Sequence, residues 1–154
     1  MTKWKLLLSI IICQLAGVVG SLFTDSISTW YVTLNKPFFT PPSWLFAPAW
    51  ITLYLLMGIS LYLVWEKGLK SRYSQISIIV FAIQLALNSI WSILFFGFQA
   101  PLLALIEIVF LWLAILASIF LFYRISKVAS YLLLPYILWV TFAGVLNFSI
   151  YYLN

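Results

Sequence analysis

The sequence predicts an all-α membrane protein, a bundle of five transmembrane helices, on the basis of its composition and its apolar runs. Of the 154 residues, 66% are hydrophobic and 7% are charged, and the mean hydropathy is +1.15. A soluble domain carries about a quarter charged residues, so these few charges cannot cover a water-facing surface and the bilayer is the expected solvent. The apolar runs do not alternate with polar residues, which excludes a β-barrel.

Five apolar runs are long enough to cross a membrane, which takes roughly 20 helical residues. Charged residues, glycine and proline separate the runs. Pro101 suits the first turn of a helix, where its missing N–H has no helical partner, and Pro135 is expected to kink or interrupt the last span. The predicted spans, within a single domain covering residues 1–154, are residues 6–23, 44–65, 75–98, 101–123 and 130–153.

Basic residues fall mainly on one side of these spans. Five crossings place seven of the eight Lys and Arg residues on the same side and only Lys36 on the other. The positive-inside rule predicts an integral multi-pass protein with a cytoplasmic N-terminus and an outer loop over residues 24–43. This topology accounts for the net charge of +5 without a nucleic-acid partner. A secretory signal is the alternative for the first run, after Lys3 and Lys5, but its full spanning length favours a membrane helix.

The residue inventory narrows the chemistry. The chain has no His, one Cys and three carboxylates, which excludes His-based catalysis, a zinc site and a disulfide within the chain. We therefore predict no metal site. Cys13, inside the first run, is expected to be a small packing residue. Glu107 lies six residues into the fourth span, where a carboxylate is costly and often functional, and we expect it to reach the outer interface.

Polar and aromatic side chains recur together at steps of three and four in three of the spans. This spacing places them on one face of each helix. An unpaired amide in hydrocarbon costs several kcal/mol, so the three faces should converge inside the bundle around a pocket with flat aromatic walls. They comprise Phe46, Trp50, Leu53, Tyr54 and Met57; Gln84, Asn88, Trp91, Ser92 and Phe95; and Tyr136, Trp139, Ala143, Leu146 and Asn147.

Such a pocket suits a large, flat, mostly apolar ligand. Aromatic ring pairs contribute roughly 0.5 to 1.5 kcal/mol beyond their buried area. The indole N–H groups of Trp50 and Trp139 and the amide of Asn88 would orient carbonyl or carboxylate groups at roughly 1 kcal/mol each. Ordinary helix packing is the alternative role for these three residues, since Asn also holds membrane helices together.

Three separated motifs resemble the TspO/MBR family of tryptophan-rich sensory proteins and translocator proteins. They follow one another in the family's order over essentially the whole chain. The motifs are Trp30-Tyr31-x-x-Leu34-Asn35-Lys36-Pro37 with the proline- and tryptophan-rich run that follows it to Trp65; Asn88-x-x-Trp91-Ser92-x-x-Phe95-Phe96-Gly97; and Pro135-Tyr136-x-x-Trp139-x-x-Phe142-Ala143-x-x-Leu146-Asn147.

The resemblance implies a homodimeric membrane protein that binds protoporphyrin IX or haem, and also sterols or isoquinoline carboxamides, as a sensor or transporter without a required cofactor. The alternative is a slow enzyme that degrades porphyrin with light and oxygen, with Trp50 and Trp139 as its catalytic residues. Without His, haem would be held by packing more than by iron coordination. The candidate ligand-binding residues are Trp30, Tyr31, Pro42, Phe46, Trp50, Tyr54, Asn88, Trp91, Phe95, Trp139, Ala143 and Leu146.

Two further expectations concern the outer loop and the last residues. Four prolines between residues 37 and 48 should stiffen the loop into a lid, where Lys36 either meets a porphyrin propionate or is an ordinary solvated charge. Animal members carry a cholesterol-recognition pattern that ends in a basic residue. Tyr151 and Tyr152 have no Lys or Arg after them, so we expect a prokaryotic source and do not expect cholesterol as the main ligand.

Overall fold

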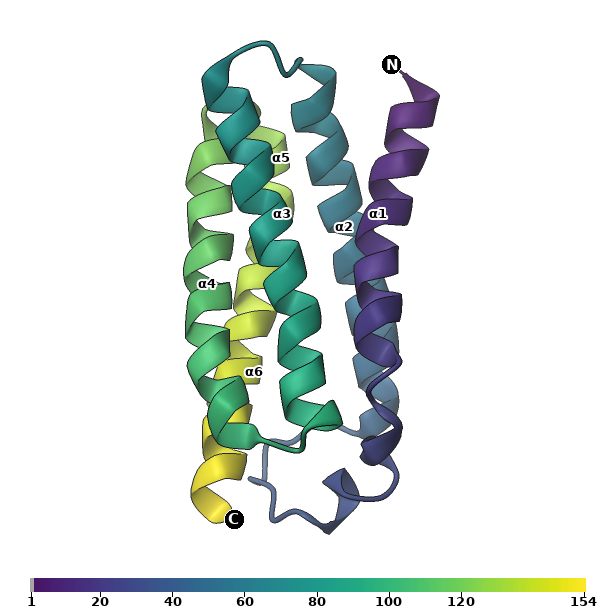
Figure 1. Cartoon of the computed structure of the whole chain (residues 1–154), viewed down its shortest axis with the longest axis vertical. Coiled ribbons are helices and arrows are strands. Elements are labelled where there is room, and N and C mark those ends of the chain that lie inside the picture. The colour runs from purple at the N-terminus through teal and green to yellow at the C-terminus, as the bar shows by residue number, and fades with distance from the viewer. Residues whose placement is uncertain (1) are drawn as a thin grey trace.

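The computed structural model describes residues 2–154, which form helices and connecting loops without a strand among them (Figure 1). A short helix, α5 (Lys127–Leu132), directly precedes the last long helix. The connection between the first two long helices contains three short 3-10 turns, η1 (Asp25–Ile27), η2 (Tyr31–Thr33) and η3 (Ser43–Leu45), and a π-helical turn, η4 (Ile93–Gly97), follows α3. The long helices are α1 (Lys3–Ser21), α2 (Phe46–Glu66), α3 (Arg72–Ser92), α4 (Pro101–Tyr123) and α6 (Leu134–Leu153).

Five helical stretches are long and apolar enough to cross a membrane, which confirms the predicted all-α, five-helix membrane fold. Three of them begin three residues earlier than predicted, at Lys3, Arg72 and Lys127. Helical hydrogen bonding continues into the charged residues that flank an apolar run, so hydropathy alone underestimates helix length. The stretches are Lys3–Ser21, Ser43–Glu66, Arg72–Gly97, Pro101–Tyr123 and Lys127–Leu153.

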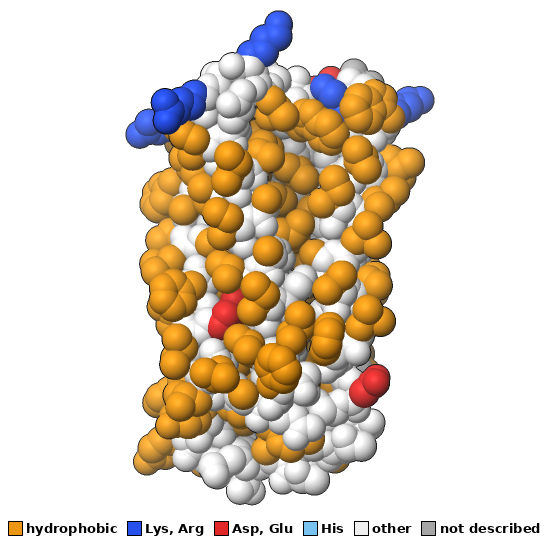
Figure 2. Space-filling model, viewed as in Figure 1, with side chains coloured by type: hydrophobic (Ala, Val, Ile, Leu, Met, Phe, Trp, Pro, Cys, Tyr) orange, Lys and Arg blue, Asp and Glu red, His pale blue; other side chains and the backbone are white. Residues whose placement is uncertain are grey.

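The helices form one elongated bundle with the two termini at opposite ends (Figure 1). α1 packs along α2, α3 packs along α4, and α4 also contacts α6. Figure 2 shows Lys and Arg side chains gathered at the end that carries the N-terminus, beyond sides covered by hydrophobic side chains. We call this the basic end, and the opposite end, which holds the loop over residues 22–45, the loop end. The helix boundaries place seven residues at the basic end: Lys3, Lys5, Lys67, Lys70, Arg72, Arg124 and Lys127.

The fifth span is interrupted close to the proline that the sequence singled out. α5 ends at Leu132, Leu133 forms a turn, and Pro135 lies in the first turn of α6. A proline in that turn removes no helical hydrogen bond, because the first N–H groups of a helix have no partner within it. The short α5 therefore forms a separate first segment of the span.

Two glycines set how closely α1 approaches α2. A Cβ built on Gly58 would lie 2.6 Å from the Cα atom of Ile10, and a backbone atom cannot rotate out of the way as a side-chain end can. A Cβ on Gly17 would overlap the ring of Tyr54. Small residues at membrane helix contacts permit this kind of approach, so the α1–α2 contact depends on the absence of a side chain at position 58.

Glu107 lies on the inward face of α4, and the expectation that it reaches the outer interface is wrong. The residue is 8% exposed, and neither carboxylate oxygen has a hydrogen-bond partner among residues 2–154. Its helical neighbours Ala104, Ile108 and Leu111 are also buried. The position of Glu107 along the helix axis does not determine its exposure. Its position around the helix does, because it points the carboxyl group into the bundle.

We expect Gly58→Ala to lower the unfolding temperature in detergent, because overpacking a tight contact costs about 1 to 3 kcal/mol. Gly144→Ala is the matched control, since its Cβ would meet no atom closer than Ile108 Cγ2 at 3.9 Å. In a helix interior alanine is favoured over glycine by about 0.5 to 1 kcal/mol, so the control should be neutral or stabilising. Thermal unfolding followed by far-UV circular dichroism measures both, and equal destabilisation would contradict the close approach.

Replacing Glu107 by Leu should raise the thermal stability of the detergent-solubilised protein. The substitution removes two buried acceptors without partners, each of which costs about 1 to 3 kcal/mol. Glu66→Leu is the control, because Glu66 lies at the basic end and accepts a hydrogen bond from Thr2. Earlier unfolding of Glu107→Leu than of the parent protein would show that this carboxyl stabilises the fold.

Candidate ligand pocket

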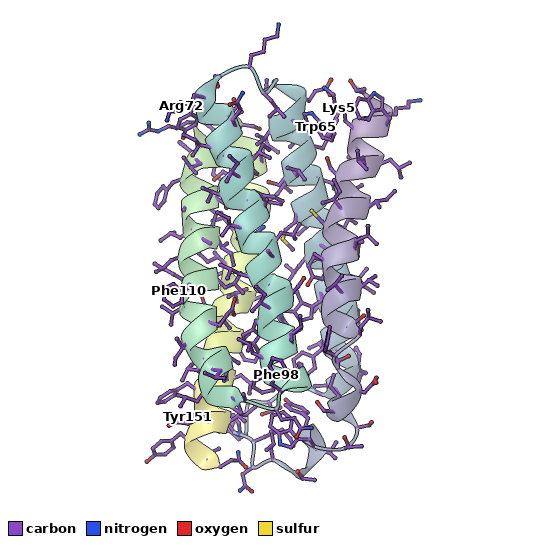
Figure 3. The ribbon with its side chains drawn as sticks, in the orientation of Figure 1. Lys5, Trp65, Arg72, Phe98, Phe110 and Tyr151 are labelled. Atoms are coloured by element: carbon purple, nitrogen blue, oxygen red, sulfur yellow. The ribbon has the colours of Figure 1, made fainter. Side chains whose placement is uncertain are left out.

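A cavity of about 340 Å³ lies between the helices in the half of the bundle next to the loop end. Its walls come from α1, α2, the last turn of α3 with η4, and α6, and η1 and η2 close it toward the loop. The volume lies within the range of about 300 to 1,000 Å³ typical of small-molecule sites. Outward-pointing side chains such as Phe110 and Tyr151 (Figure 3) leave the inward faces of α4 and α6 to pack the interior.

The structure brings nine of the twelve candidate ligand-binding residues to the cavity wall. They come from three predicted faces and the loop, which are far apart in sequence and meet only in the folded bundle. The nine residues are Tyr31, Phe46, Trp50, Tyr54, Trp91, Phe95, Trp139, Ala143 and Leu146.

The aromatic rings of the wall pack against one another edge-to-face and stacked. Trp50 and Trp139 lie 6.4 Å apart between ring centroids at 88°, and Phe46 packs edge-on against Trp139 at 6.3 Å. Trp91 stacks on Phe95 at 5.2 Å and 23°. These are favourable aromatic geometries, so the flat walls are held rigidly by contacts between the rings.

Hydrogen bonding divides the tryptophans into two groups. The indole N–H of Trp91 donates to Asn147 Oδ1 at 3.1 Å, and Asn147 Nδ2 donates to the carbonyl of Pro101 at 2.9 Å. The indole N–H groups of Trp50 and Trp139 donate to no acceptor within residues 2–154. Both rings line the cavity, so the cavity wall contains two tryptophans whose indole N–H groups take no part in the hydrogen bonds of residues 2–154.

Asn88 lies behind the cavity wall, and its amide is not free to orient a ligand. Asn88 Oδ1 accepts from the Tyr54 hydroxyl, and Asn88 Nδ2 donates to the Tyr136 hydroxyl at 2.8 Å. Tyr136 in turn donates to Gln84 Oε1 at 2.8 Å. The sequence predicted correctly that this amide faces inward, but it could not show that partners on α2 and α6 use both of its polar atoms.

Trp30 and Pro42 also lie off the cavity wall. Trp30 is half-buried and packs edge-on against Phe95, with ring centroids 5.7 Å apart. Pro42 is exposed, and its carbonyl accepts from the backbone N–H of Leu45 at the start of α2. Both residues shape the segments next to the cavity.

Lys36 forms hydrogen bonds with backbone carbonyls of the outer loop to which it belongs. Its Nζ donates to the carbonyls of Tyr31 at 2.9 Å and Leu34 at 3.1 Å, and lies 4.9 Å from the Tyr31 ring centroid. The ammonium group thus donates hydrogen bonds to carbonyls in and just after η2, a role that neither expected alternative included. The Tyr31 side chain is 3% exposed, its hydroxyl has no partner within residues 2–154, and burial raises the pKa of Tyr31. Its hydroxyl therefore stays protonated at neutral pH.

A second pair of contacts ties the loop to the end of α6. The backbone N–H of Asn35 donates to Asn154 Oδ1 at 3.0 Å, and Asn154 Nδ2 donates back to the Asn35 carbonyl at 2.9 Å. One side-chain amide thus satisfies both backbone groups of Asn35. Together with Lys36, this pairing fixes the loop segment that follows Tyr31, whose side chain lines the cavity.

α1 contributes wall residues that the sequence did not indicate. Gln14, Gly17, Val18 and Ser21 line the cavity, and Gln14 Nε2 donates to the carbonyl of Ile51 on α2 at 3.1 Å. Gln14 is the single amide residue within α1. That single amide in an apolar run was the available signal for an inward face.

A shallow apolar groove lies outside the cavity between α2 and α6. Pro48 and Pro135 contribute to it, and Trp139 and Phe142 line both the groove and the cavity. These two rings are therefore the partition between the interior site and the membrane-facing surface. Within residues 2–154 there is no cluster of His, Cys, Asp and Glu that could hold a metal ion.

Comparison with known proteins gives a consistent result over nearly the whole chain. The family model described as the TspO/MBR family matches residues 9–153. A tryptophan-rich protein TspO of Archaeoglobus fulgidus is 51% identical over 151 residues, covering 97% of each chain. One of Chlorobaculum tepidum is 47% identical over 150 residues, covering 97% of this chain and 95% of the relative. The translocator protein of Bos taurus is 36% identical over 140 residues, covering 90% and 83%.

The three sequence motifs, which run from Trp30 to Asn147, lie within the range that the family model matches. The identity to these two prokaryotic proteins exceeds that to the bovine protein by more than ten percentage points. The chain belongs to the TspO/MBR family of membrane proteins.

Proposed function

We propose that this protein binds tetrapyrroles, protoporphyrin IX or haem, within the membrane and acts as a sensor or transporter for them. The observation that carries the proposal is the cavity whose wall contains Trp50 and Trp139 as perpendicular rings with unpaired indole N–H groups. A planar macrocycle has two large π-faces for such rings and peripheral carboxylates for the donors.

The apolar character of the cavity supports the same class of ligand. Most of its wall is aromatic or aliphatic, and no charged residue belongs to its lining. Binding energy would therefore come mainly from buried apolar area, at about 25 cal/mol per Å². Haem would bind in the same way, through packing of the ring. Sterols and isoquinoline carboxamides meet the same requirements and are included in the proposal, as is assembly into a homodimer.

Slow light- and oxygen-dependent breakdown of porphyrin is the second candidate function. The close pair of Trp50 and Trp139, 6.4 Å apart between centroids, places two oxidisable indoles on the cavity wall. In this reaction the illuminated porphyrin is oxidised and molecular oxygen is reduced. The two tryptophans would be its catalytic residues.

Titration with protoporphyrin IX in detergent, in the dark and under light, tests both candidates through the Soret band. We expect a shifted band in the dark, and about a tenfold or smaller loss of affinity in Trp50→Phe and Trp139→Phe, since each loses one hydrogen-bond donor but keeps a ring. Trp65→Phe, at the basic end, is the control and should bind like the parent. An unshifted band would refute binding.

Illumination separates binding from chemistry. Loss of the Soret band with a new product band in the parent protein, and its absence in Trp50→Phe at saturating ligand, would establish the oxidative reaction. A band that is shifted but stable in light would leave binding as the function. Equal product yield from Trp50→Phe, Trp139→Phe and the parent would rule out these two residues as catalytic.

We further propose that the basic end faces the cytoplasm, as the positive-inside rule implies. In a Cys13→Ser background, a membrane-impermeant maleimide applied to intact cells should label Phe38→Cys and not Lys70→Cys. Phe38 is fully exposed in the outer loop, Lys70 is exposed at the basic end, and the native thiol of Cys13 is buried. The reverse labelling pattern would invert the topology.

A further inference from the structure

Four polar side chains form a continuous hydrogen-bonded chain behind the cavity wall. It runs from Tyr54 on α2 through Asn88 on α3 to Tyr136 on α6, and returns to Gln84 on α3. Gln84 Nε2 ends the chain 3.8 Å from Met57 Sδ. Asn88 is 3% exposed, Gln84 1% and Tyr136 0%, so neither water nor lipid replaces these partners. The chain connects three helices at one depth in the membrane.

The two tyrosines of this chain are also the rings that hold Trp50. The Trp50 indole stacks on Tyr54 with centroids 5.6 Å apart at 27°, and meets Tyr136 edge-on at 6.4 Å and 72°. Asn88 bridges the hydroxyls of both rings. The separation and tilt of the surfaces around Trp50 thus depend on one amide that does not line the cavity.

α1 closes this arrangement from the opposite side. Gly17 lies so close to the Tyr54 ring that an added Cβ would overlap it. Tyr54 is therefore held between the backbone of α1 and the indole of Trp50, and its hydroxyl is held by Asn88. A change of the Tyr54 χ1 angle would move the hydroxyl away from Asn88 and break this hydrogen bond.

We propose that Asn88 is a positioning residue for Trp50: by bridging the Tyr54 and Tyr136 hydroxyls, it fixes the indole and so determines how a ligand lies in the cavity without touching that ligand. The effect on the ligand rests on the proposed function, whereas the fixed position of the Trp50 indole does not depend on it.

The chemistry of the bridge requires an amide. Asn88 must accept from Tyr54 and donate to Tyr136, because Tyr136 already gives its own proton to Gln84. A carboxylate offers two acceptors and no donor, and leucine offers neither. Removing the amide leaves buried phenol groups without their partner, which is costly where no water can replace it.

The first experiment measures the indole without any ligand. Protein labelled with 5-fluorotryptophan gives ¹⁹F signals for the tryptophans, and the Trp50 signal is identified by its loss in Trp50→Phe. We expect Asn88→Leu and Tyr54→Phe each to shift or broaden the Trp50 signal. Ser60→Ala is the matched control, since it removes a buried bond from Ser60 Oγ to the Ala129 carbonyl between α2 and α5, and should leave that signal unchanged.

Tyr54→Phe keeps the proposal testable if Asn88→Leu does not fold, because it breaks the bridge while retaining the ring. The double variant Asn88→Leu with Tyr54→Phe should resemble Asn88→Leu, since the one bond that Tyr54→Phe removes is already absent in Asn88→Leu. An unmoved Trp50 signal in Tyr54→Phe and in any folded Asn88 variant would overturn the proposal. This result does not depend on whether porphyrin binds.

The second experiment measures ligand orientation through the induced circular dichroism of bound protoporphyrin IX in the Soret region. An achiral macrocycle acquires this signal from its geometry relative to nearby rings. We expect it to fall at least about twofold in both Asn88→Leu and Tyr54→Phe, with affinity reduced about tenfold or less. Loss of affinity in Asn88→Leu alone, with Tyr54→Phe like the parent, would assign Asn88 a direct ligand contact and overturn the proposal. No binding by the parent protein would instead refute the proposed function.

Discussion

The hydrocarbon core of a membrane offers no hydrogen-bond partners, and this constraint governs where most polar side chains of the five spans lie. Ser9, Tyr62 and Glu107 are the exceptions among residues 2–154, since their buried polar atoms have no partner there. Some hydroxyl groups within the helices donate to carbonyls one turn earlier, as Thr52 does to Pro48 and Thr141 to Ile137. Others bond to another helix, as Ser60 does to the carbonyl of Ala129. Amides have no such local solution and bond across helices, as Asn147 does to the carbonyl of Pro101. Polar groups thereby connect helices whose apolar surfaces gain little by leaving lipid for one another.

The same constraint separates structural polar groups from those available to a ligand. Asn88, Gln84 and Tyr136 form hydrogen bonds with one another and do not line the cavity. What remains on the wall is a pair of indole donors, on Trp50 and Trp139, surrounded by rings. Buried polar groups without partners also occur away from the cavity, at Ser9, Tyr62 and Glu107, so the two unpaired indoles are notable because their rings line a cavity.

The sequence was sufficient for the spans and for three of the inward faces, because both follow from periodicity in one segment at a time. The sequence was insufficient wherever the direction or the hydrogen-bond partners of a side chain depended on a neighbouring helix. Glu107 points into the bundle because of its angular position around α4. Asn88 does not line the cavity, and its amide is hydrogen-bonded to tyrosines on α2 and α6. The part of α1 in the wall was missed for the same reason: Gly17 carries no side chain, and its importance is visible only against the Tyr54 ring.

The distribution of polar groups also determines what kind of selectivity the cavity can have. Two neutral donors contribute about 1 kcal/mol each, whereas burying about 300 Å² of apolar ligand surface contributes on the order of 7 kcal/mol at about 25 cal/mol per Å². Shape and flatness therefore dominate affinity, and hydrogen bonds mainly set orientation. Chemically different flat molecules can share such a site, because no charged group in the wall rejects them. Discrimination among them then depends on the angle between the rings, and that angle depends on the polar chain behind Trp50.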